Sequence, residues 1–192
     1  MGKKLNLFSE LRQLDLQAAN LVAISLTQRM FINAQIYFTH TKQTKELVYL
    51  QQVMDNLWAF VSTGKKVTNI ETTIEKMLEI TNTLPSDNVG AFSARDFIVS
   101  MIQCVESNSE PDAQIAVTIA KISQGDIERY LELIENREIT PEAFRQHELV
   151  QNEINIITAL MQATRGLAPA SIAKDIRSEL LEQNLSNLGL SF

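Results

Sequence analysis

The chain has 192 residues, with 17 basic and 23 acidic side chains and a formal net charge of −6 at pH 7. Net negative charge repels nucleic-acid phosphates and anionic lipids, so we expect no nucleic-acid partner and no membrane partner. Apolar residues make up 45% of the chain, which at this length is enough for a well-buried core. We therefore expect one domain over residues 1–192.

Glycine and proline are scarce, with six and four residues, so their share is well below the usual value of about 12%. Between them, apolar residues recur at spacings of three and four, which is typical of helices with one buried face. No alternating strand pattern of useful length appears. The sequence predicts an all-α bundle of seven to eight helices.

The first 63 residues contain no glycine or proline after Gly2, which is too long for one helix in a small domain. We place breaks near residues 15–17 and 39–44. The helix between them, about residues 18–38, is apolar almost all round, so we expect it at the centre of the bundle. Its several charged and amide side chains argue against a membrane span.

Two capping-box patterns predict where later helices begin. Thr68 and Glu71 precede one apolar stripe, and Ser93 and Asp96 precede another. Beyond them, we expect Gly125 to kink or break a helix that carries apolar residues on both sides of it.

The last two predicted helices begin at prolines. Thr140 followed by Pro141 is an N-cap with a first-turn proline, and that helix is expected to reach about Arg165. The final helix is expected from about Pro169 to Asn184. Between residues 126 and 142 the chain is rich in acids, which we interpret as a solvated helix face: Asp126, Glu128, Glu132, Glu135, Glu138 and Glu142.

Residue types that carry chemistry are few. Cys104 is the only cysteine, and we interpret it as a small buried side chain in a reducing compartment, which favours a cytoplasmic location. Of the two histidines, His147 is interpreted as partly buried and hydrogen-bonded. The run STGKKVT at residues 62–68 lacks the first glycine of a phosphate loop, so it is interpreted as a basic loop. We expect no metal and no cofactor.

Polar side chains that interrupt the apolar stripes are the candidate functional residues. A buried charge is tolerated only when it is paired, so an inward-facing arginine must meet a carboxylate. The cluster forms either a structural clamp between helices or the floor of a pocket for a small anionic ligand, and we favour the clamp. The candidate ligand-binding residues are Arg29, Asn33, Asp55, Trp58, Glu153 and Arg177.

Several of these residues lie in segments that resemble the YjaG-like family, a group of uncharacterised, all-helical proteobacterial proteins. The segments are Gln28–Asn33, Val53–Trp58, Ile176–Leu180 and Ser186–Leu190, with Asp96 and Glu153 at matching positions. The last two segments, Ile176–Leu180 followed by Ser186–Leu190, are the most telling ones. The resemblance implies an all-helical cytoplasmic bacterial protein, and it implies no activity.

The sequence leaves the biochemical function unknown and supports two hypotheses. The first is a non-enzymatic helical protein that acts through protein–protein contacts, with itself as a homodimer or with another protein. The alternative is a small-molecule binder or enzyme that holds an anionic ligand with Arg29 or Arg177 and uses Asp55 or Glu153 as acid or base.

Overall fold

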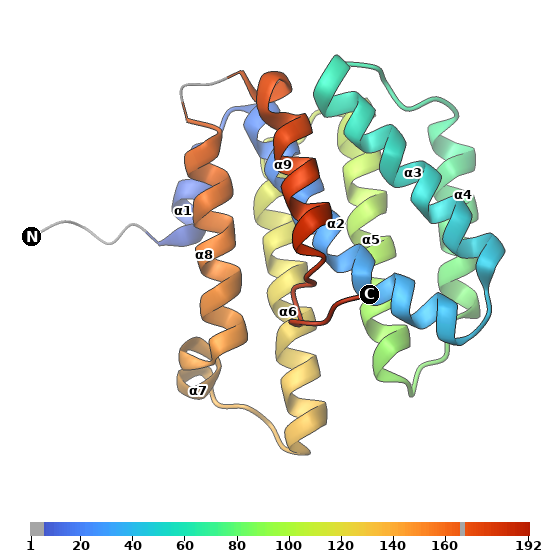
Figure 1. Cartoon of the computed structure of the whole chain (residues 1–192), viewed down its shortest axis with the longest axis vertical. Coiled ribbons are helices and arrows are strands. Elements are labelled where there is room, and N and C mark those ends of the chain that lie inside the picture. The colour runs from blue at the N-terminus through green and yellow to red at the C-terminus, as the bar shows by residue number, and fades with distance from the viewer. Residues whose placement is uncertain (1–5, 166–167) are drawn as a thin grey trace, which may run out of the picture.

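The computed structural model describes residues 6–165 and 168–192, and that part of the chain forms nine α-helices and no strand. The all-α class predicted from the sequence is therefore confirmed. Figure 1 shows the helices, which are α1 (Leu7–Leu11), α2 (Leu16–His40), α3 (Thr44–Thr63), α4 (Ile70–Thr83), α5 (Val89–Ser109), α6 (Ile115–Glu135), α7 (Pro141–Gln146), α8 (Glu148–Ala163) and α9 (Pro169–Gln183).

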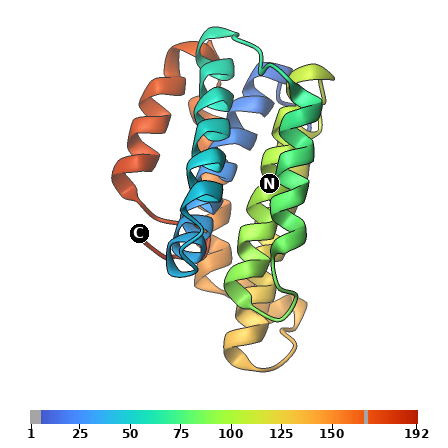
Figure 2. The ribbon, with the colours of Figure 1, turned by 90° about the vertical axis from the view of Figure 1, so that its right-hand side faces the viewer.

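Helix α2 is the most enclosed element. Nineteen of its 25 residues are buried, and it contacts α3, α5, α6, α8 and α9. Figure 2 shows α9 on one side of the molecule and α4 and α5 on the other, with α2 and α3 between them. A helix covered on so many sides places its polar residues against other helices, where each needs a partner.

Two apolar clusters form the interior. The larger one joins α2 to α3, α5 and α9, and within it the rings of Phe31 and Phe97 lie 5.0 Å apart between centroids. The smaller one contains Ile127 and Leu131 of α6, Val150 of α8, and Leu188 from beyond the last helix. The segment after α9 is therefore part of the interior.

The breaks expected at residues 15–17 and 39–44 are confirmed, as is the last helix. Asp15 caps α2, where its side chain accepts a hydrogen bond of 2.9 Å from the backbone N–H of Ala18. The expected cap at Thr140 with Pro141 after it is also found, at α7. These local signals are reliable because the capping partners lie within three residues of each other.

Both predicted capping boxes are wrong. Helix α4 begins one residue after Asn69, which has a left-handed conformation and makes no side-chain cap. Helix α5 begins at Val89, capped by Asn88, so Ser93 and Asp96 lie inside it. The hydroxyl of Ser93 instead donates a hydrogen bond to Asp126 of α6. This contact depends on the tertiary structure, so the capping pattern does not predict it.

Two other expectations about helix ends are also wrong. Gly125 does not break α6, which continues from Ile115 to Glu135, because packing on both sides outweighs a cost of about 1 kcal/mol for one helical glycine. Conversely, the helix expected from Pro141 to Arg165 is split. His147 adopts an extended conformation there and caps α8 by accepting a 3.2 Å hydrogen bond from the N–H of Leu149.

Within the described residues, no helix is both long enough and apolar enough to cross a membrane.

The Phe31–Phe97 contact yields a prediction about stability. Replacing Phe97 by Ala removes a fully buried ring from the contact between α2 and α5, and we expect the free energy of unfolding to fall by about 3–5 kcal/mol. Val99→Ala, on the exposed side of the same helix, is the matched control and is expected to change it by less than about 1 kcal/mol. Urea unfolding followed by circular dichroism measures both.

Candidate functional site

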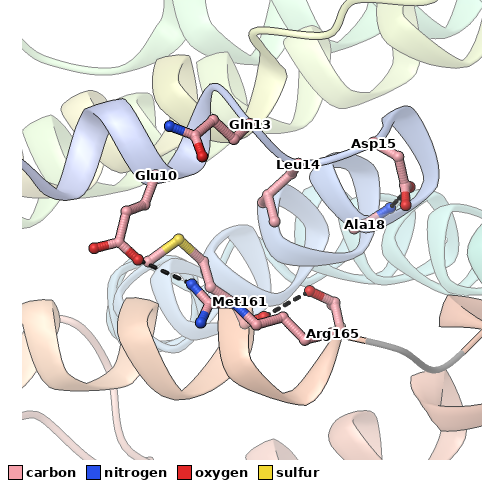
Figure 3. Close-up of a pocket in the computed structure, with 8 residues that line it drawn as sticks. Glu10, Gln13, Leu14, Asp15, Ala18, Met161 and Arg165 are labelled. Carbon is pink, nitrogen blue, oxygen red and sulfur yellow. Dashed lines mark hydrogen bonds and ion pairs between the residues drawn. The ribbon is translucent and has the colours of Figure 1, made fainter. Parts of the chain in front are cut away.

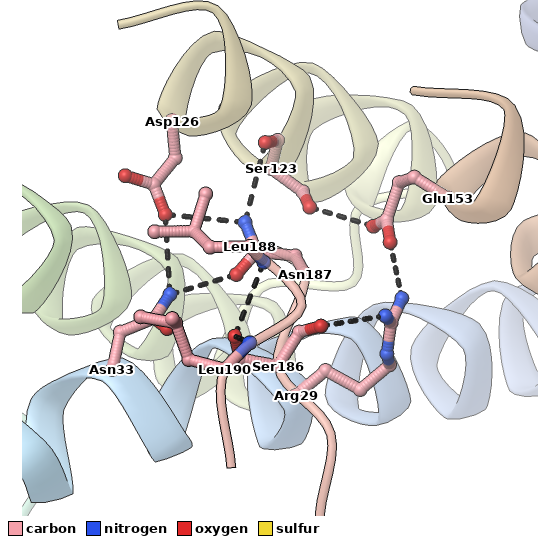
Figure 4. A network of polar contacts seen from close by, with 9 residues as sticks. All are labelled: Arg29, Asn33, Ser123, Asp126, Glu153, Ser186, Asn187, Leu188 and Leu190. Atoms are coloured by element: carbon pink, nitrogen blue, oxygen red, sulfur yellow. Dashed lines mark hydrogen bonds and ion pairs between the residues drawn. The ribbon is translucent and has the colours of Figure 1, made fainter. Parts of the chain in front are cut away.

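A buried ion pair connects α2 to α8. Arg29 of α2 donates to a carboxylate oxygen of Glu153 in α8, and the two side chains are 4% and 1% exposed. The second Glu153 oxygen accepts a 2.6 Å hydrogen bond from the hydroxyl of Ser123 in α6. The other terminal nitrogen of Arg29 donates over 2.9 Å to the backbone oxygen of Ser186. Three helices and the C-terminal tail meet at this pair (Figure 4).

A second carboxylate lies in the same network, one turn further along α6. The two oxygens of Asp126 accept hydrogen bonds from the Ser93 hydroxyl at 2.7 Å and from the Asn187 amide at 3.1 Å. Asn33 of α2 donates to the Asn187 side-chain oxygen at 2.8 Å and to Asp126 at 3.4 Å. Arg29 and Asn33, four residues apart on one face of α2, therefore hold the two halves of the network. We call these residues, with Ser186, the buried polar network.

The C-terminal tail, residues 184–192, enters this network through a tight turn. The hydroxyl of Ser186 accepts hydrogen bonds from the N–H groups of Leu188 and Leu190, and the N–H of Ser186 donates to the Leu190 oxygen. Gly189 has a φ of 72°, a left-handed conformation that favours glycine. The turn directs Asn187 to the polar network and Leu188 to the smaller apolar cluster.

Burial changes the acidity of two groups near the centre of the molecule. It raises the pKa of Asp126 to about 6, against the hydrogen bonds from Ser93 and Asn187, which lower it. Burial likewise raises the pKa of the Cys104 thiol to about 12, so this cysteine stays protonated and a poor nucleophile. The prediction that Cys104 is buried is confirmed.

The six candidate residues fall into two separate groups. Arg29, Asn33 and Glu153 belong to the buried polar network. Asp55 of α3 pairs with Arg177 of α9 at the surface, where the two side chains are 50% and 30% exposed. Arg177 also lies over the ring of Trp58, whose indole N–H donates 2.8 Å to Gln28 of α2. The second group therefore fastens α9 to α3.

Five members of the buried polar network are not among the six candidate residues. Asp126 was assigned to a solvated acidic face, and that interpretation is wrong for this residue, because it is 1% exposed. The signal that places it inward is its spacing of seven from Ile119 and four from Ile122, on the apolar face of α6. Ser123, Ser186 and Asn187 carry no helical pattern that distinguishes them from surface residues.

None of the six candidates lines any of the five main cavities among the described residues. Figure 3 shows one cavity, of about 350 Å³, between α1, the start of α2 and α8. Its charged groups are already engaged, since Glu10 pairs with Arg165 over 3.0 Å and Asp15 caps α2. Within residues 6–165 and 168–192, no group of three or more His, Cys, Asp or Glu side chains is arranged to hold a metal ion.

Comparisons with known proteins identify the lineage of the chain. The DUF416 family, described as "Protein of unknown function", matches residues 6–191. A crystal structure of a DUF416 family protein from Shewanella baltica OS155 is similar with a TM-score of 0.85 and 24% sequence identity, over 98% of this chain and 100% of that one. At that identity the likeness shows a shared fold alone. No curated protein matches the chain.

The buried ion pair gives a prediction with a built-in comparison. Arg29→Met leaves the Glu153 carboxylate buried without its cation, and we expect the free energy of unfolding to fall by about 3–5 kcal/mol. Arg29→Met combined with Glu153→Met removes both charges and is expected to recover most of that loss. Arg177→Met, at the exposed pair, should cost under about 1 kcal/mol. Equal effects of the two arginine substitutions in urea unfolding would contradict this account.

The raised pKa of Asp126 predicts how stability depends on pH. In the folded protein this carboxyl keeps its proton up to about pH 6, whereas in the unfolded chain it loses it near pH 3.8. The protonated Asp126 carboxyl therefore contributes fully to stability below pH 3.8, and this contribution is lost as the pH rises through 6. We expect the free energy of unfolding to fall by about 3 kcal/mol over that range. Burial also raises the pKa of Asp96, which acts in the same direction. Urea unfolding from pH 4 to 8 should therefore show a smaller slope in Asp126→Asn than in the wild type.

Proposed function

The chain belongs to the DUF416 family, and we propose that it is a non-enzymatic, cytoplasmic helical protein that acts through contacts with other protein chains, among them a second copy of itself as a homodimer. Within the family we propose that it is one of the YjaG-like bacterial proteins, from the segments at residues 28–33, 53–58, 176–180 and 186–190. The observation that carries the functional proposal is an exposed apolar surface at the C-terminal end of the chain.

Three large apolar side chains make up this surface, which we call the C-terminal patch. Leu181, Leu185 and Phe192 are 54%, 42% and 56% exposed. The side-chain amide of Asn184, between the two leucines in sequence, donates a hydrogen bond to the backbone oxygen of Phe192, which holds residue 192 next to the end of α9. Clustered exposed apolar side chains of this size are typical of protein interaction sites.

The buried polar network supports this proposal because it holds the patch in place. Arg29 and Asn33 bind Ser186 and Asn187, the residues that immediately follow Leu185. A tail tied to the interior at these two positions has little freedom, so the patch is presented in one arrangement. Preorganised surfaces bind with a smaller entropic cost than flexible ones. In this proposal the polar residues act as the clamp, and their role in binding is indirect.

The alternative function, in which the same polar residues hold an anionic ligand, has weaker support. Arg29 gives its two terminal nitrogens to Glu153 and Ser186, and Glu153 receives Arg29 and Ser123. An anion would have to replace a partner that is already in place. Arg177 is accessible, but it pairs with Asp55 and stacks over Trp58. The hydroxyls of Ser123 and Ser93 donate to the two buried carboxylates, but these serines are 0% and 3% exposed, so a substrate does not reach them.

The C-terminal patch predicts which substitution separates the copies. Leu181→Glu places a charge in the centre of an apolar contact, where it loses its hydration without gaining a partner, and we expect the homodimer to dissociate about tenfold more readily. Sedimentation equilibrium on the wild type and the variant at several concentrations measures the dissociation constant.

Leu78→Glu is the matched control, because Leu78 is a leucine with 46% exposure on α4, away from the C-terminal patch. It should leave the dissociation constant unchanged, and circular dichroism should show both variants folded. A wild-type protein that remains monomeric at tens of micromolar, or equal effects of Leu181→Glu and Leu78→Glu, would overturn the homodimer.

A further inference from the structure

A cavity of about 310 Å³ lies where four helix ends meet, at the upper end of the molecule in Figure 1. It opens between the first turns of α2 and α9 and the last turns of α3 and α5. Its walls are mainly apolar, and of the five main cavities among the described residues it has the greatest excess of apolar wall over polar wall. We call it the end cavity; its apolar lining includes Leu16, Phe60, Val61, Pro111 and Pro169.

Asn108, at the end of α5, supplies an unused hydrogen-bond donor in the wall of the end cavity. The side chain is 3% exposed, and its oxygen accepts a 3.3 Å hydrogen bond from the backbone N–H of Val67. That donor fixes the orientation of the amide, because a reversed amide would set its NH₂ against the Val67 N–H. The NH₂ group has no hydrogen-bond partner among the described residues. A buried donor left unpaired is destabilising, and an acceptor from water or from a ligand satisfies it.

The other polar groups around Asn108 are already paired with each other. Asn20 accepts a 3.1 Å hydrogen bond from the Ser107 hydroxyl and donates to the backbone oxygen of Leu16. Ser107 in turn accepts a hydrogen bond from the N–H of Asp112. Among the buried polar side chains of this wall, the amide NH₂ of Asn108 is therefore the donor without a partner, whereas Gln17, which also lines the cavity, is exposed to solvent.

Lys66 adds a positive charge to the lining of the same cavity. It is exposed and belongs to the basic loop at residues 62–68. Apolar walls, one buried donor and one cation at the lining together match a ligand with an apolar body and an acceptor that carries a single negative charge. A carboxylate has two oxygens, one for each donor, and one charge for the one lysine, whereas a phosphate brings a second charge that has no partner here.

From this arrangement we propose that the end cavity binds a small aliphatic monocarboxylate, with the carboxylate between Lys66 and Asn108 and the chain against Phe60 and Val61. If each non-hydrogen atom takes about 30 Å³, the volume of a water molecule in the liquid, the cavity holds about ten of them. Octanoate is a ligand of that size. This site shares no residue with the buried polar network or with the C-terminal patch. Its existence is therefore independent of the homodimer.

Octanoate titrated into ¹⁵N-labelled protein and followed by NMR tests the site, with 1-octanol as the uncharged probe of equal length. We expect saturable shifts of the amide signals of Val67, Asn108 and Ala170, and weaker binding of 1-octanol. Lys66→Gln should weaken octanoate binding about two- to fivefold, the usual range for one exposed ion pair, and leave 1-octanol unchanged. Lys65→Gln, next to it but outside the cavity lining, is the matched control and should have no effect.

Ala170→Phe fills the cavity from α9 with a ring and should abolish binding of both probes, whereas Ser178→Phe, two turns further along the same helix and outside the lining, should not. Non-saturable shifts, shifts located elsewhere, or 1-octanol binding as tightly as octanoate would overturn the proposal. Equal effects of Lys66→Gln and Lys65→Gln would do so as well. If Ala170→Phe fails to fold, the lysine pair and the two probes still decide the outcome.

Discussion

The ion pair between Arg29 and Glu153 is the constraint on which the middle of this molecule depends. Two opposite charges can stay in a protein interior only when they meet each other and when their remaining donors and acceptors are also filled. Here Ser123 completes the carboxylate and the backbone of Ser186 completes the guanidinium. The requirement to satisfy one arginine thus brings three helices and the chain terminus to a single point, and it makes the C-terminal tail a structural part of the bundle.

The enclosure of α2 explains why such a network exists. A helix covered by five neighbours has no solvated side on which to place a polar residue, so Arg29 and Asn33 are paired inside. Their partners come from α6, α8 and the tail, which are distant in sequence. The network therefore links segments that are far apart in the sequence. Its second carboxylate, Asp126, is held among three hydrogen-bond donors, and burial raises its pKa all the same.

Three parts of the molecule thus have separate physical roles. In the buried polar network the side-chain oxygen of Asn33 has no hydrogen-bond partner, whereas both carboxylates and the guanidinium bond to other members, as expected of a structural clamp. The C-terminal patch is apolar and exposed beside that clamp, and the end cavity combines apolar walls with a donor that lacks a partner. The two proposed binding surfaces, the C-terminal patch and the end cavity, lie apart from each other, and the buried polar network holds the segment that carries the patch.

The sequence by itself determined the helical class, the interruptions around residues 15 and 41, the burial of Cys104 and the start of the last helix, because these depend on apolar spacing and on contacts within a few residues. It also marked Arg29, Asn33 and Glu153 as polar residues in apolar stripes. Only the tertiary structure decided that Arg29 meets Glu153 while Arg177 meets Asp55, and that Ser93 and Asp126 point inward. The choice of partners among the charged residues and the burial of the short Ser-Asn-Leu-Gly-Leu tail are settled by residues 33 to 157 positions away, and local patterns hold no information about them.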